Sequence, residues 1–291
     1  MKINTASLNM KRLTKKLTTL HTFWVLMILL LLCIGFSIIT PRGTFLSVIN
    51  FKSLAADSSQ LIILTIGAAY LLISAGIDLS NGSLLVLCTV LTVKLLIWLT
   101  SFIPVSIAII IGALFAMLFG SLIGIVNGLL VTKLHIPSFI ATLGTMGATL
   151  GFARLASNGT NVPGVPKELM NFINMDLLGI PIIAYMAVLL VILSSVVLKY
   201  TRFGLHTIAI GSNIESARRA GIKVEFTQVM VYGLMGLMVG IVAVIDLGRF
   251  GVASIAAHTT DNLQAIAGAV IGGTSLFGGR GSILGSAVGA F

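Results

Sequence analysis

The sequence predicts an all-α integral membrane protein, built as a polytopic helical bundle with broken or re-entrant helices. Of its 291 residues, 57% are hydrophobic and only 9% are charged, and the mean hydropathy is +1.11. This composition cannot supply the polar shell that a water-soluble fold needs. Apolar runs of about 20 residues, the length that crosses a bilayer, recur along the chain. Glycine and polar residues interrupt several of these runs, which predicts breaks in the helices.

The first apolar run covers residues 22–40 and follows a basic arm, residues 1–21. This arrangement resembles a secretory signal, but the run is long enough to span the bilayer and no small-residue cleavage pattern follows it. We therefore expect a cytoplasmic arm and then a first transmembrane helix. Seven more apolar runs cover residues 54–74, 82–100, 105–131, 138–156, 180–198, 226–247 and 263–276. Together they predict one transmembrane domain, residues 22–291.

Basic residues are divided unevenly between the two sides that these runs define. With the N-terminus inside, the inner segments hold twelve Lys and Arg residues and the outer segments hold four. Cytoplasmic segments of membrane proteins carry such an excess, so the count supports this orientation. The same rule explains the net charge of +10 without nucleic acid, for which the sequence has no recognition motif. Residues 158–179 then form an extracytoplasmic loop.

Residues 74–83, which read SAGIDLSNGS, separate two of the apolar runs. An aspartate at the bilayer centre costs about 2.5–3.5 kcal/mol on insertion scales, so Asp78 is expected to face protein, water or free backbone N–H groups. Asp78 and Ser80 would suit the N-cap of a half-helix in a broken transmembrane segment. The motif is then a tight turn, part of a translocation path that includes Asn81 and Gly82, or both.

A glycine-rich segment, residues 272–282, reads GGTSLFGGRGS. It lacks the Lys-Ser/Thr ending of a Walker A loop and follows no predicted strand, so nucleotide binding is not expected. An irregular re-entrant connection explains the glycines better, and Thr274 and Ser275 would then belong to the translocation path. Close helix packing is the simplest role for glycines in other runs, at Gly128, Gly144 and Gly147.

Residues 199–225 form a polar segment between two apolar runs. The five basic residues outnumber the two acidic residues, Glu215 and Glu225. Such a segment is expected to be exposed and to meet an anionic or acidic neighbour. In the orientation above it faces the cytoplasm.

The sequence contains no constellation typical of catalysis or metal binding. The carboxylates are neither paired nor spaced for metal or acid–base work, and lone loop histidines are usually solvated. Cys33 and Cys88 lie inside apolar runs, where a thiol usually acts as a small hydrophobe, so neither a disulfide nor a metal site is expected. The four histidines are scattered along the chain, at His21, His135, His206 and His258.

Four segments carry a family pattern. They are GIDLSNGS at 76–83, TLGTMGATLGFAR at 142–154, TRFGLHTIAIGSNIESARRAGI at 201–222 and IAGAVIGGTSLFGGRGSILGSAVGA at 266–290. In order and spacing they resemble the membrane permeases of bacterial ABC importers for monosaccharides, the ribose, xylose and autoinducer-2 group. The resemblance begins near Phe45, and branched-chain amino-acid permeases are more distant relatives.

This resemblance implies a core of two permease subunits with about ten helices each, two cytoplasmic ATPase subunits and a periplasmic sugar-binding protein. The chain itself would not be an enzyme and would need no cofactor, because ATP is bound by its partners. It would lie among the lipids of the bacterial inner membrane. The family's coupling segment, a short cytoplasmic helix that binds a groove of the ATPase, maps onto Gly211, Asn213, Glu215, Ala217, Arg218, Arg219, Gly221 and Ile222. Asn213 or Ser212 would cap this helix.

Two alternatives to a working importer permease stay open. An ion- or proton-coupled secondary carrier or channel would need intramembrane carboxylates, and Asp78 is the one candidate. An inactive truncated permease is the other alternative, because the chain stops about nine residues, or about 14 Å of helix, after Ser282. That length is too short for a hydrocarbon core of about 30 Å, so the last helices of the family are expected to be missing. Asn81 also departs from the family, which usually has an apolar residue there.

Overall fold

The computed structural model describes residues 21–41 and 43–291, so all of the predicted basic arm except His21 lies outside the described residues. Six of the described helices are long and apolar enough to cross a membrane. They are α3 (Val48–Ile73), α4 (Asn81–Leu99), α5 (Val105–Thr132), α6 (Ser138–Ser157), α8 (Ile182–Tyr200) and α11 (Val224–Phe250). The predicted all-α polytopic fold is confirmed, and these helices match the second to seventh predicted crossings.

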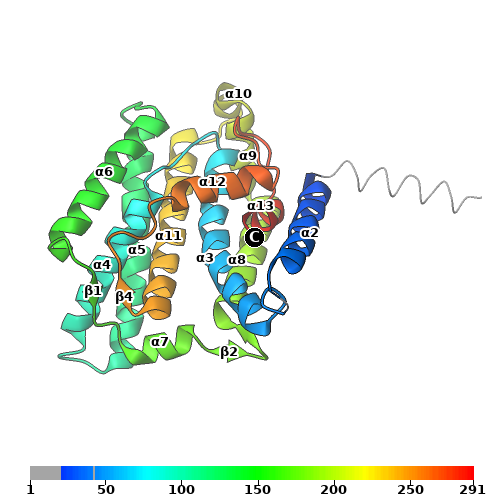
Figure 1. Cartoon of the computed structure of the whole chain (residues 1–291). Coiled ribbons are helices and arrows are strands. Elements are labelled where there is room, and N and C mark those ends of the chain that lie inside the picture. Colours follow the sequence, from blue (N-terminus) through cyan, green and yellow to red (C-terminus); the bar gives the residue numbers. More distant parts are fainter. Residues whose placement is uncertain (1–20, 42) are drawn as a thin grey trace, which may run out of the picture.

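Three of the six helices form the centre of the bundle. Most of the apolar length of α3, α4 and α11 is buried, whereas most of α5, α6 and α8 is partly buried or exposed. Figure 1 shows α11 running between α5 and α3, and it packs extensively against both. Exposed leucines on α5, such as Leu118 and Leu122, face outward as expected for side chains in contact with lipid.

The backbones of α5 and α11 approach closely because small residues face each other. Gly120 and Gly124 of α5 meet α11, while Gly236 and Gly240 of α11 meet α5. A Cβ on any of these four residues would collide with backbone atoms of the opposite helix. Small residues at such spacing are typical of helix packing in membranes.

The other glycines that we expected to pack against helices give a mixed result. A Cβ at Gly128 would lie 2.7 Å from the Cα of Val229 in α11, so this glycine does serve helix packing. At Gly144 and Gly147 of α6 no atom of the described residues lies within 4 Å of the Cβ position. Within the described part of the chain, these two glycines therefore do not pack against another helix as predicted.

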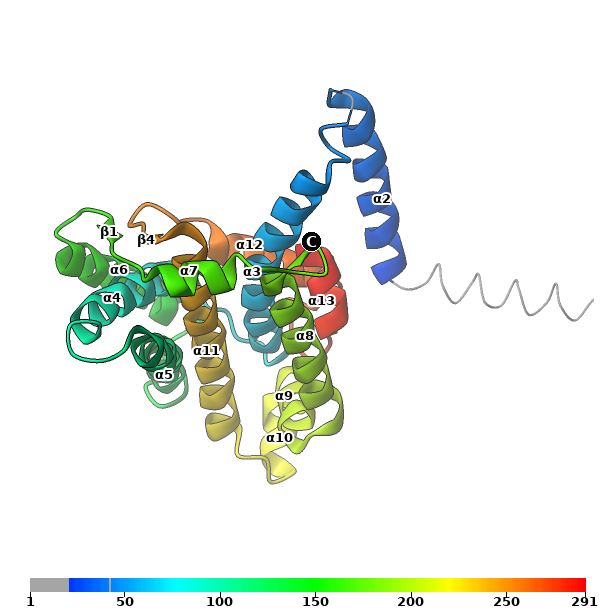
Figure 2. The ribbon, with the colours of Figure 1, turned by 90° about the horizontal axis from the view of Figure 1, so that it is seen from below.

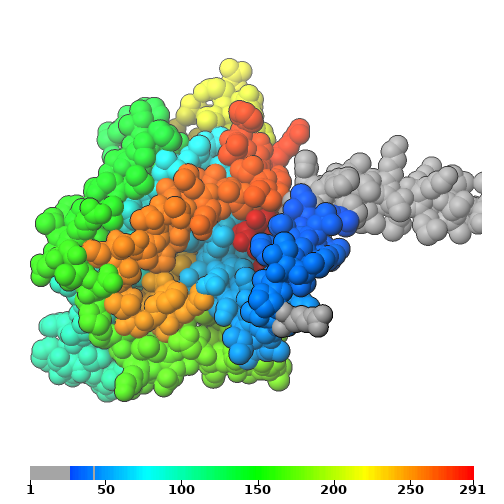
Figure 3. Space-filling model, viewed as in Figure 1, coloured from blue at the N-terminus to red at the C-terminus, as the bar shows by residue number. Residues whose placement is uncertain are grey.

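The first predicted crossing is present as one helix, whereas the last differs from a simple span. Residues 22–40 form α2 (His21–Ile39), which stands at the edge of the bundle near α13 (Ile283–Ala290), as Figure 2 shows. Residues 263–276 contribute only to α12 (Asp261–Ile271), and eleven residues of helix extend about 16 Å. The eighth crossing is thus wrong as a continuous span, because the glycine-rich segment ends the helix early. In Figure 3 the chain from β4 through α12, in orange, lies across one face of the bundle.

The predicted extracytoplasmic loop, residues 158–179, is more structured than expected. It contains α7 (Lys167–Ile173), and Ile173 packs against Gly248 near the end of α11. Two antiparallel pairs of two-residue strands flank this helix: β1 (Val162–Pro163) with β4 (Val252–Ala253), and β2 (Asp176–Leu177) with β3 (Ile180–Pro181). These elements close one end of the bundle (Figure 1).

The predicted polar loop, residues 199–225, lies at the opposite end and is mostly helical. After α8 ends at Tyr200, the chain forms α9 (Arg202–Ser212) and α10 (Ile214–Arg219), and then enters α11. Thr201 begins α9, because its side chain accepts a hydrogen bond from the backbone N–H of Gly204. In Figure 1, α10 is the outermost element of this end.

Candidate functional site

Two breaks in the helical bundle meet inside it. The first break, residues 74–80, separates α3 from α4, and the second break, residues 251–260, separates α11 from α12. The first break starts at the end of the bundle that carries α10, and the second starts at the opposite end (Figure 1). Residues from both breaks and from the helices α4, α5, α11 and α12 form the candidate site.

The first break turns the chain back into the bundle. Ala75 adopts the left-handed conformation, with φ of 60°, and the Gly76 N–H donates to the Leu71 carbonyl at 2.8 Å. Residues 76–80 have no regular structure, and α4 starts at Asn81, which is fully buried. The chain therefore places non-helical backbone inside the bundle, which a membrane protein tolerates only where other groups satisfy that backbone.

Asp78 is the most strongly held side chain of the first break. It is 4% exposed, and its Oδ1 accepts hydrogen bonds from the Ser80 backbone N–H at 2.7 Å and from Ser80 Oγ at 2.6 Å. Asn127 of α5 donates to Ser80 Oγ at 2.9 Å and lies 3.5 Å from Asp78 Oδ2. Asp78 faces protein, as predicted. It closes an Asx-type turn two residues on, however, and α4 has no side-chain N-cap, so the predicted cap is wrong.

Polar side chains from other helices hold the backbone of the first break. The Tyr232 hydroxyl of α11 donates to the Ile77 carbonyl at 3.3 Å, and the Asn262 amide of α12 donates to the Leu79 carbonyl at 3.0 Å. Our sequence prediction omits Asn127, Tyr232 and Asn262. The signal that was available is that an asparagine inside an apolar run is costly unless it has a polar partner.

The two breaks touch at Gly82. A Cβ at this position would collide with the backbone carbonyl of His258, so the contact requires glycine. Beside the contact lies a cavity of about 150 Å³, whose polar wall includes Ser83 and Asn262. The side-chain amide oxygens of Asn81, Asn127 and Asn262 are buried and accept no hydrogen bond from the described residues. Of these three asparagines only Asn262 lines the cavity, so its amide oxygen is the one that is placed to accept a hydrogen bond from a water or a solute hydroxyl group there.

His258 corrects the expectation that the histidines and carboxylates are isolated. Its Nδ1 lies 2.7 Å from Asp261 Oδ2, and its Nε2 lies 3.3 Å from Asp246 Oδ1. His258 lies in the second break, outside the spanning helices. Burial disfavours the charged imidazole, but the carboxylates of Asp246 and Asp261 outweigh burial and raise the pKa of His258 to about 9. The side chain therefore carries a positive charge between two carboxylates at neutral pH.

Thr274 and Ser275 lie in a different place from the other predicted path residues. Thr274 Oγ1 lies 2.9 Å from Ser286 Oγ of α13, and the Ser275 N–H donates to the Arg280 carbonyl at 3.0 Å. Both residues thus stabilise the glycine-rich segment and its contact with α13. Asp78, Ser80, Asn81 and Gly82, by contrast, are brought together at the first break.

The helix α10 is a separate candidate site at the other end of the bundle. Asn213 caps it, because its Oδ1 accepts from the Ser216 N–H at 2.8 Å. Glu215 lies in the first turn and Arg218 in the last, where the helix dipole favours these charges. Gly221 follows with φ of +81°, a conformation that glycine adopts without strain and that commonly ends helices. The helix predicted from the sequence is therefore present.

Contacts to neighbouring elements fix α10 in place. Ala217 is buried with Ile210 and Val224, while Arg218 pairs with Glu215 at 3.2 Å and with Glu225 of α11 at 2.7 Å. The rest of α10 is exposed, including Arg219. A cavity of about 460 Å³ reaches from Glu215 and Arg218 to Gly76 in the first break.

A second contact joins this end to the first break. Gly211, near the end of α9, packs so closely on Ile73 and Gly279 that a Cβ would collide with their backbone atoms. The Gly279 N–H also donates to the Ile73 carbonyl at 2.9 Å. The last residue of α3, the last turn of α9 and the glycine-rich segment therefore meet at one point, which we call the glycine junction.

Among residues 21–41 and 43–291, no group of three or more His, Cys, Asp or Glu side chains is arranged to hold a metal ion. Cys33 and Cys88 are free thiols.

A family model described as "Branched-chain amino acid transport system / permease component" matches residues 50–291. The match starts within α3 and includes both breaks, α10 and the glycine junction. It therefore covers every element of the candidate site described above.

Curated relatives resemble most of the chain. The ribose import permease protein RbsC of Bacillus subtilis is 38% identical over 263 residues, which are 90% of this chain and 79% of the relative. The autoinducer 2 import system permease protein LsrC of Escherichia coli is 32% identical over 247 residues, 85% of this chain and 70% of the relative. LsrC of Yersinia pseudotuberculosis is 32% identical over 249 residues, 85% and 68% of the two chains. The comparison with solved structures gives no match.

Proposed function

Because the chain belongs to the family of branched-chain amino acid transport system permease components, we propose that it forms the membrane path for a monosaccharide in an ABC importer. Two of its similar relatives are named as permeases for ribose and for autoinducer 2, which supports a ribose-like sugar over an amino acid. The uncharged amide oxygen of Asn262 in the cavity beside Gly82 supports the same substrate class, since sugar hydroxyl groups are neutral donors and acceptors.

ATP hydrolysis is assigned to partner subunits in this proposal. An ABC importer permease works with an ATPase and a substrate-binding protein, so the chain itself needs no nucleotide, other cofactor or nucleic acid. A second permease subunit, identical or different, completes the membrane core. The chain contributes one permease domain, residues 22–291, which lies in the inner membrane with the N-terminal arm and residues 199–225 in the cytoplasm. The excess of Lys and Arg on that side supports this orientation.

The helix α10 is the observation that carries the proposal of coupling. It is short, capped at both ends and exposed, and it presents Glu215, Arg218 and Arg219 at the surface. An exposed polar helix that is rigidly attached to the bundle suits a groove on a soluble partner. We assign ATPase binding to the predicted coupling residues, which are Gly211, Asn213, Glu215, Ala217, Arg218, Arg219, Gly221 and Ile222.

The contacts of α10 suggest how its movement reaches the path. ATP-driven closure of the ATPase pair would displace α10, and the Arg218–Glu225 ion pair and the glycine junction would carry that displacement to α11 and α3. The first break lies directly after α3. Movement of Asp78, Ser80, Asn81 and Gly82 against the second break, together with Thr274 and Ser275, would then open the path alternately to each side.

Co-purification in detergent tests this function. The chain is expressed with the ATPase and binding protein of its own transport system, and ATP hydrolysis is measured with and without ribose-loaded binding protein. We expect the complex to form and hydrolysis to rise with the loaded binding protein. A well-folded chain that binds no ATPase would rule the proposal out.

Charge reversal in α10 tests the coupling surface. Arg218→Glu combined with Arg219→Glu should remove most of the co-purified ATPase, while Lys167→Glu in the exposed helix α7 is the matched control at the other end. Exposed ion pairs contribute only about 0.2–1 kcal/mol each, so the double variant should still fold. Unchanged assembly in the folded double variant would exclude α10 as the coupling helix.

A further inference from the structure

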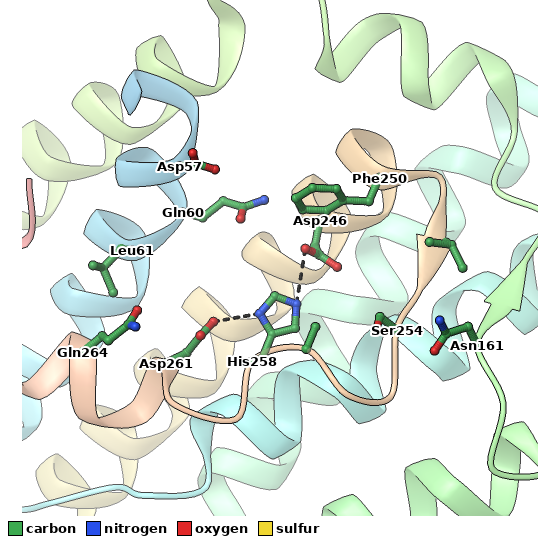
Figure 4. A pocket seen from close by; sticks show the side chains of 12 residues that line it. Asp57, Gln60, Leu61, Asn161, Asp246, Phe250, Ser254, His258, Asp261 and Gln264 are labelled. Atoms are coloured by element: carbon green, nitrogen blue, oxygen red, sulfur yellow. Dashed lines mark hydrogen bonds and ion pairs between the residues drawn. The ribbon is translucent and has the colours of Figure 1, made fainter. Parts of the chain in front are cut away.

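A polar cavity of about 460 Å³ lies beside the second break, at the end of the bundle opposite α10. Its wall is formed by α3, α11 and the chain from residue 252 to residue 264, as Figure 4 shows. This volume lies in the range of about 300–1,000 Å³ that is typical of ligand pockets. The candidate path residues Asp78 and Ser80 are not among those that line it.

The cavity contains a buried carboxylate that lacks hydrogen bonds. Asp246 of α11 is 3% exposed, and its Oδ1 accepts no hydrogen bond from the described residues. Its charged neighbour is His258, whose Nε2 lies 3.3 Å from that oxygen but is not aligned to donate a hydrogen bond. Buried carboxylates normally receive several hydrogen bonds, so Asp246 retains unused capacity to accept.

The same cavity contains donors that lack acceptors. Gln60 of α3 points toward the cavity in Figure 4, and its Nε2 is buried with no hydrogen-bond acceptor among the described residues, as is Nε2 of His258. A buried polar group without a hydrogen-bond partner destabilises the fold, so a ligand that pairs with it gains that free energy on binding. A ligand that both accepts and donates hydrogen bonds would satisfy Asp246 and Gln60 together.

We propose that this cavity binds a neutral polyhydroxylated solute of monosaccharide size, with Asp246 accepting hydrogen bonds from its hydroxyl groups and Gln60 donating to them. This inference rests on the proposed transport function and extends it by naming a binding site for the solute. A hydroxyl group is both donor and acceptor, so one class of ligand fits both sets of unpaired atoms. The ring of Phe250 adds an apolar wall, which suits the C–H faces of a sugar ring.

Charged ligands fit the cavity less well. An anion would meet the carboxylates of Asp57, Asp246 and Asp261, which all line it. A metal cation would meet the positive charge of His258 and the N–H groups of Gln60. Arg249 further compensates the acidic groups, because its Nη2 lies 2.5 Å from Asp57 Oδ1. The charges are therefore largely balanced without a bound ion.

The position of the cavity indicates its role in transport. It lies at the end of the bundle away from α10, which is the side where a binding protein would release its solute. A weak site there would receive the solute and pass it toward the crossing of the two breaks, since His258 lines both this cavity and the smaller cavity at Gly82.

Protection of an engineered thiol tests this site directly. The full chain carrying Ser254→Cys, which lines the cavity, is reconstituted in lipid nanodiscs and labelled with a maleimide. The unsubstituted chain, with Cys33 and Cys88, gives the background rate. D-ribose, sodium gluconate and calcium chloride are the neutral, anionic and cationic probes. Ribose at twice its Kd should slow labelling about threefold, because one-third of the sites remain free, and the two ionic probes should have no effect.

Variants of the two proposed ligand contacts complete the test. Gln60→Leu and Asp246→Asn should abolish protection by ribose, whereas Asp176→Asn, an aspartate outside the cavity that pairs with Lys52, should retain it. If Asp246→Asn does not fold, Gln60→Leu still decides the matter. Protection by calcium alone, or protection that survives Gln60→Leu, would overturn the proposal.

Ribose uptake into vesicles that contain the ATPase and the binding protein separates this inference from the proposed function. Uptake without protection would overturn the site and leave the transport function standing. Protection without uptake would support the site and count against transport. Absence of both would overturn both.

Discussion

Two buried aspartates, one beside each break, have nearly equal burial and opposite surroundings. Asp78 at the first break is 4% exposed and Asp246 beside the second break is 3% exposed. Asp78 accepts two hydrogen bonds from Ser80 and has Asn127 nearby. Among the described residues, Asp246 Oδ1 accepts no hydrogen bond, and His258 lies within ion-pair distance of it. Burial alone therefore does not distinguish a structural carboxylate from one that is available to a ligand.

This difference in hydrogen bonding indicates that the two breaks have different roles. At the first break, the helix hydrogen bonds end with α3, and the Asp78 carboxylate instead accepts the hydrogen bond from the Ser80 N–H. This contact holds the break in one conformation. At the second break the polar groups face a cavity and remain unpaired. We infer that Asp78 at the first break supports the fold and that Asp246 beside the second break is available to a solute.

Replacing Gly82 should have the largest effect, because both breaks depend on this contact. Gly82→Val would place side-chain atoms on the His258 carbonyl, so we expect loss of most of the folded protein. Gly147→Val in α6 is the matched control, since no described atom lies within 4 Å of its Cβ position. The yield of monodisperse protein in detergent measures both. Equal yields for the two variants would show that the breaks do not need to touch.

Replacing Asp78 or Asp246 should change the free energy of unfolding by different amounts, which distinguishes the two breaks. Asp78→Ala leaves the Ser80 N–H and hydroxyl without their acceptor, so we expect a loss of about 2–4 kcal/mol in the free energy of unfolding. Asp246→Asn removes one of the two carboxylates that face the charged imidazole of His258, and we expect a smaller loss than for Asp78→Ala because Asp261 still pairs with that imidazole. Unfolding in mixed micelles with increasing SDS compares the two. A greater loss for Asp246→Asn would reverse the roles that we assign.

A change of pH should have the smallest effect and should act on the second break alone. The folded-state pKa of His258, about 9, lies above the ordinary value of 6.5. Its stabilising contribution is therefore complete below pH 6.5 and is lost as the pH rises through about 9. The melting temperature should fall over this range, and His258→Gln should remove most of the change. The same fall in the His258→Gln variant would mean that other groups cause it.

The sequence predicts the helices better than the contacts between them. Long apolar runs identify six spanning helices, and the family resemblance predicts α10, with which the local cap and charge signals at Asn213, Glu215 and Gly221 agree because a cap and a dipole involve only neighbouring residues. The short α12 was predicted as a full crossing because the apolar run continues past Ile271, although the glycine-rich segment ends the helix there.

The contacts of the candidate site could not be predicted in the same way. Asn262 reaches the Leu79 carbonyl across more than 180 residues of chain, and Gly82 meets His258 across a similar distance in sequence. Such pairs depend on the tertiary arrangement and leave no local pattern. One contact could be predicted from the sequence: His258 and Asp261 are three residues apart, a spacing that allows their side chains to pair. The sequence does not indicate that Asp246 also contacts His258.

The glycine junction has a consequence for the timing of transport. The Gly279 N–H donates a hydrogen bond to the carbonyl of Ile73, the residue that precedes the first break. The glycine-rich segment that follows α12 is therefore attached to the end of α3. A displacement of α9 therefore acts on the first break through Ile73 and on the second break through α12, because both connections start at this one contact. The two breaks should consequently move in a single concerted step, with no intermediate in which only one of them has moved.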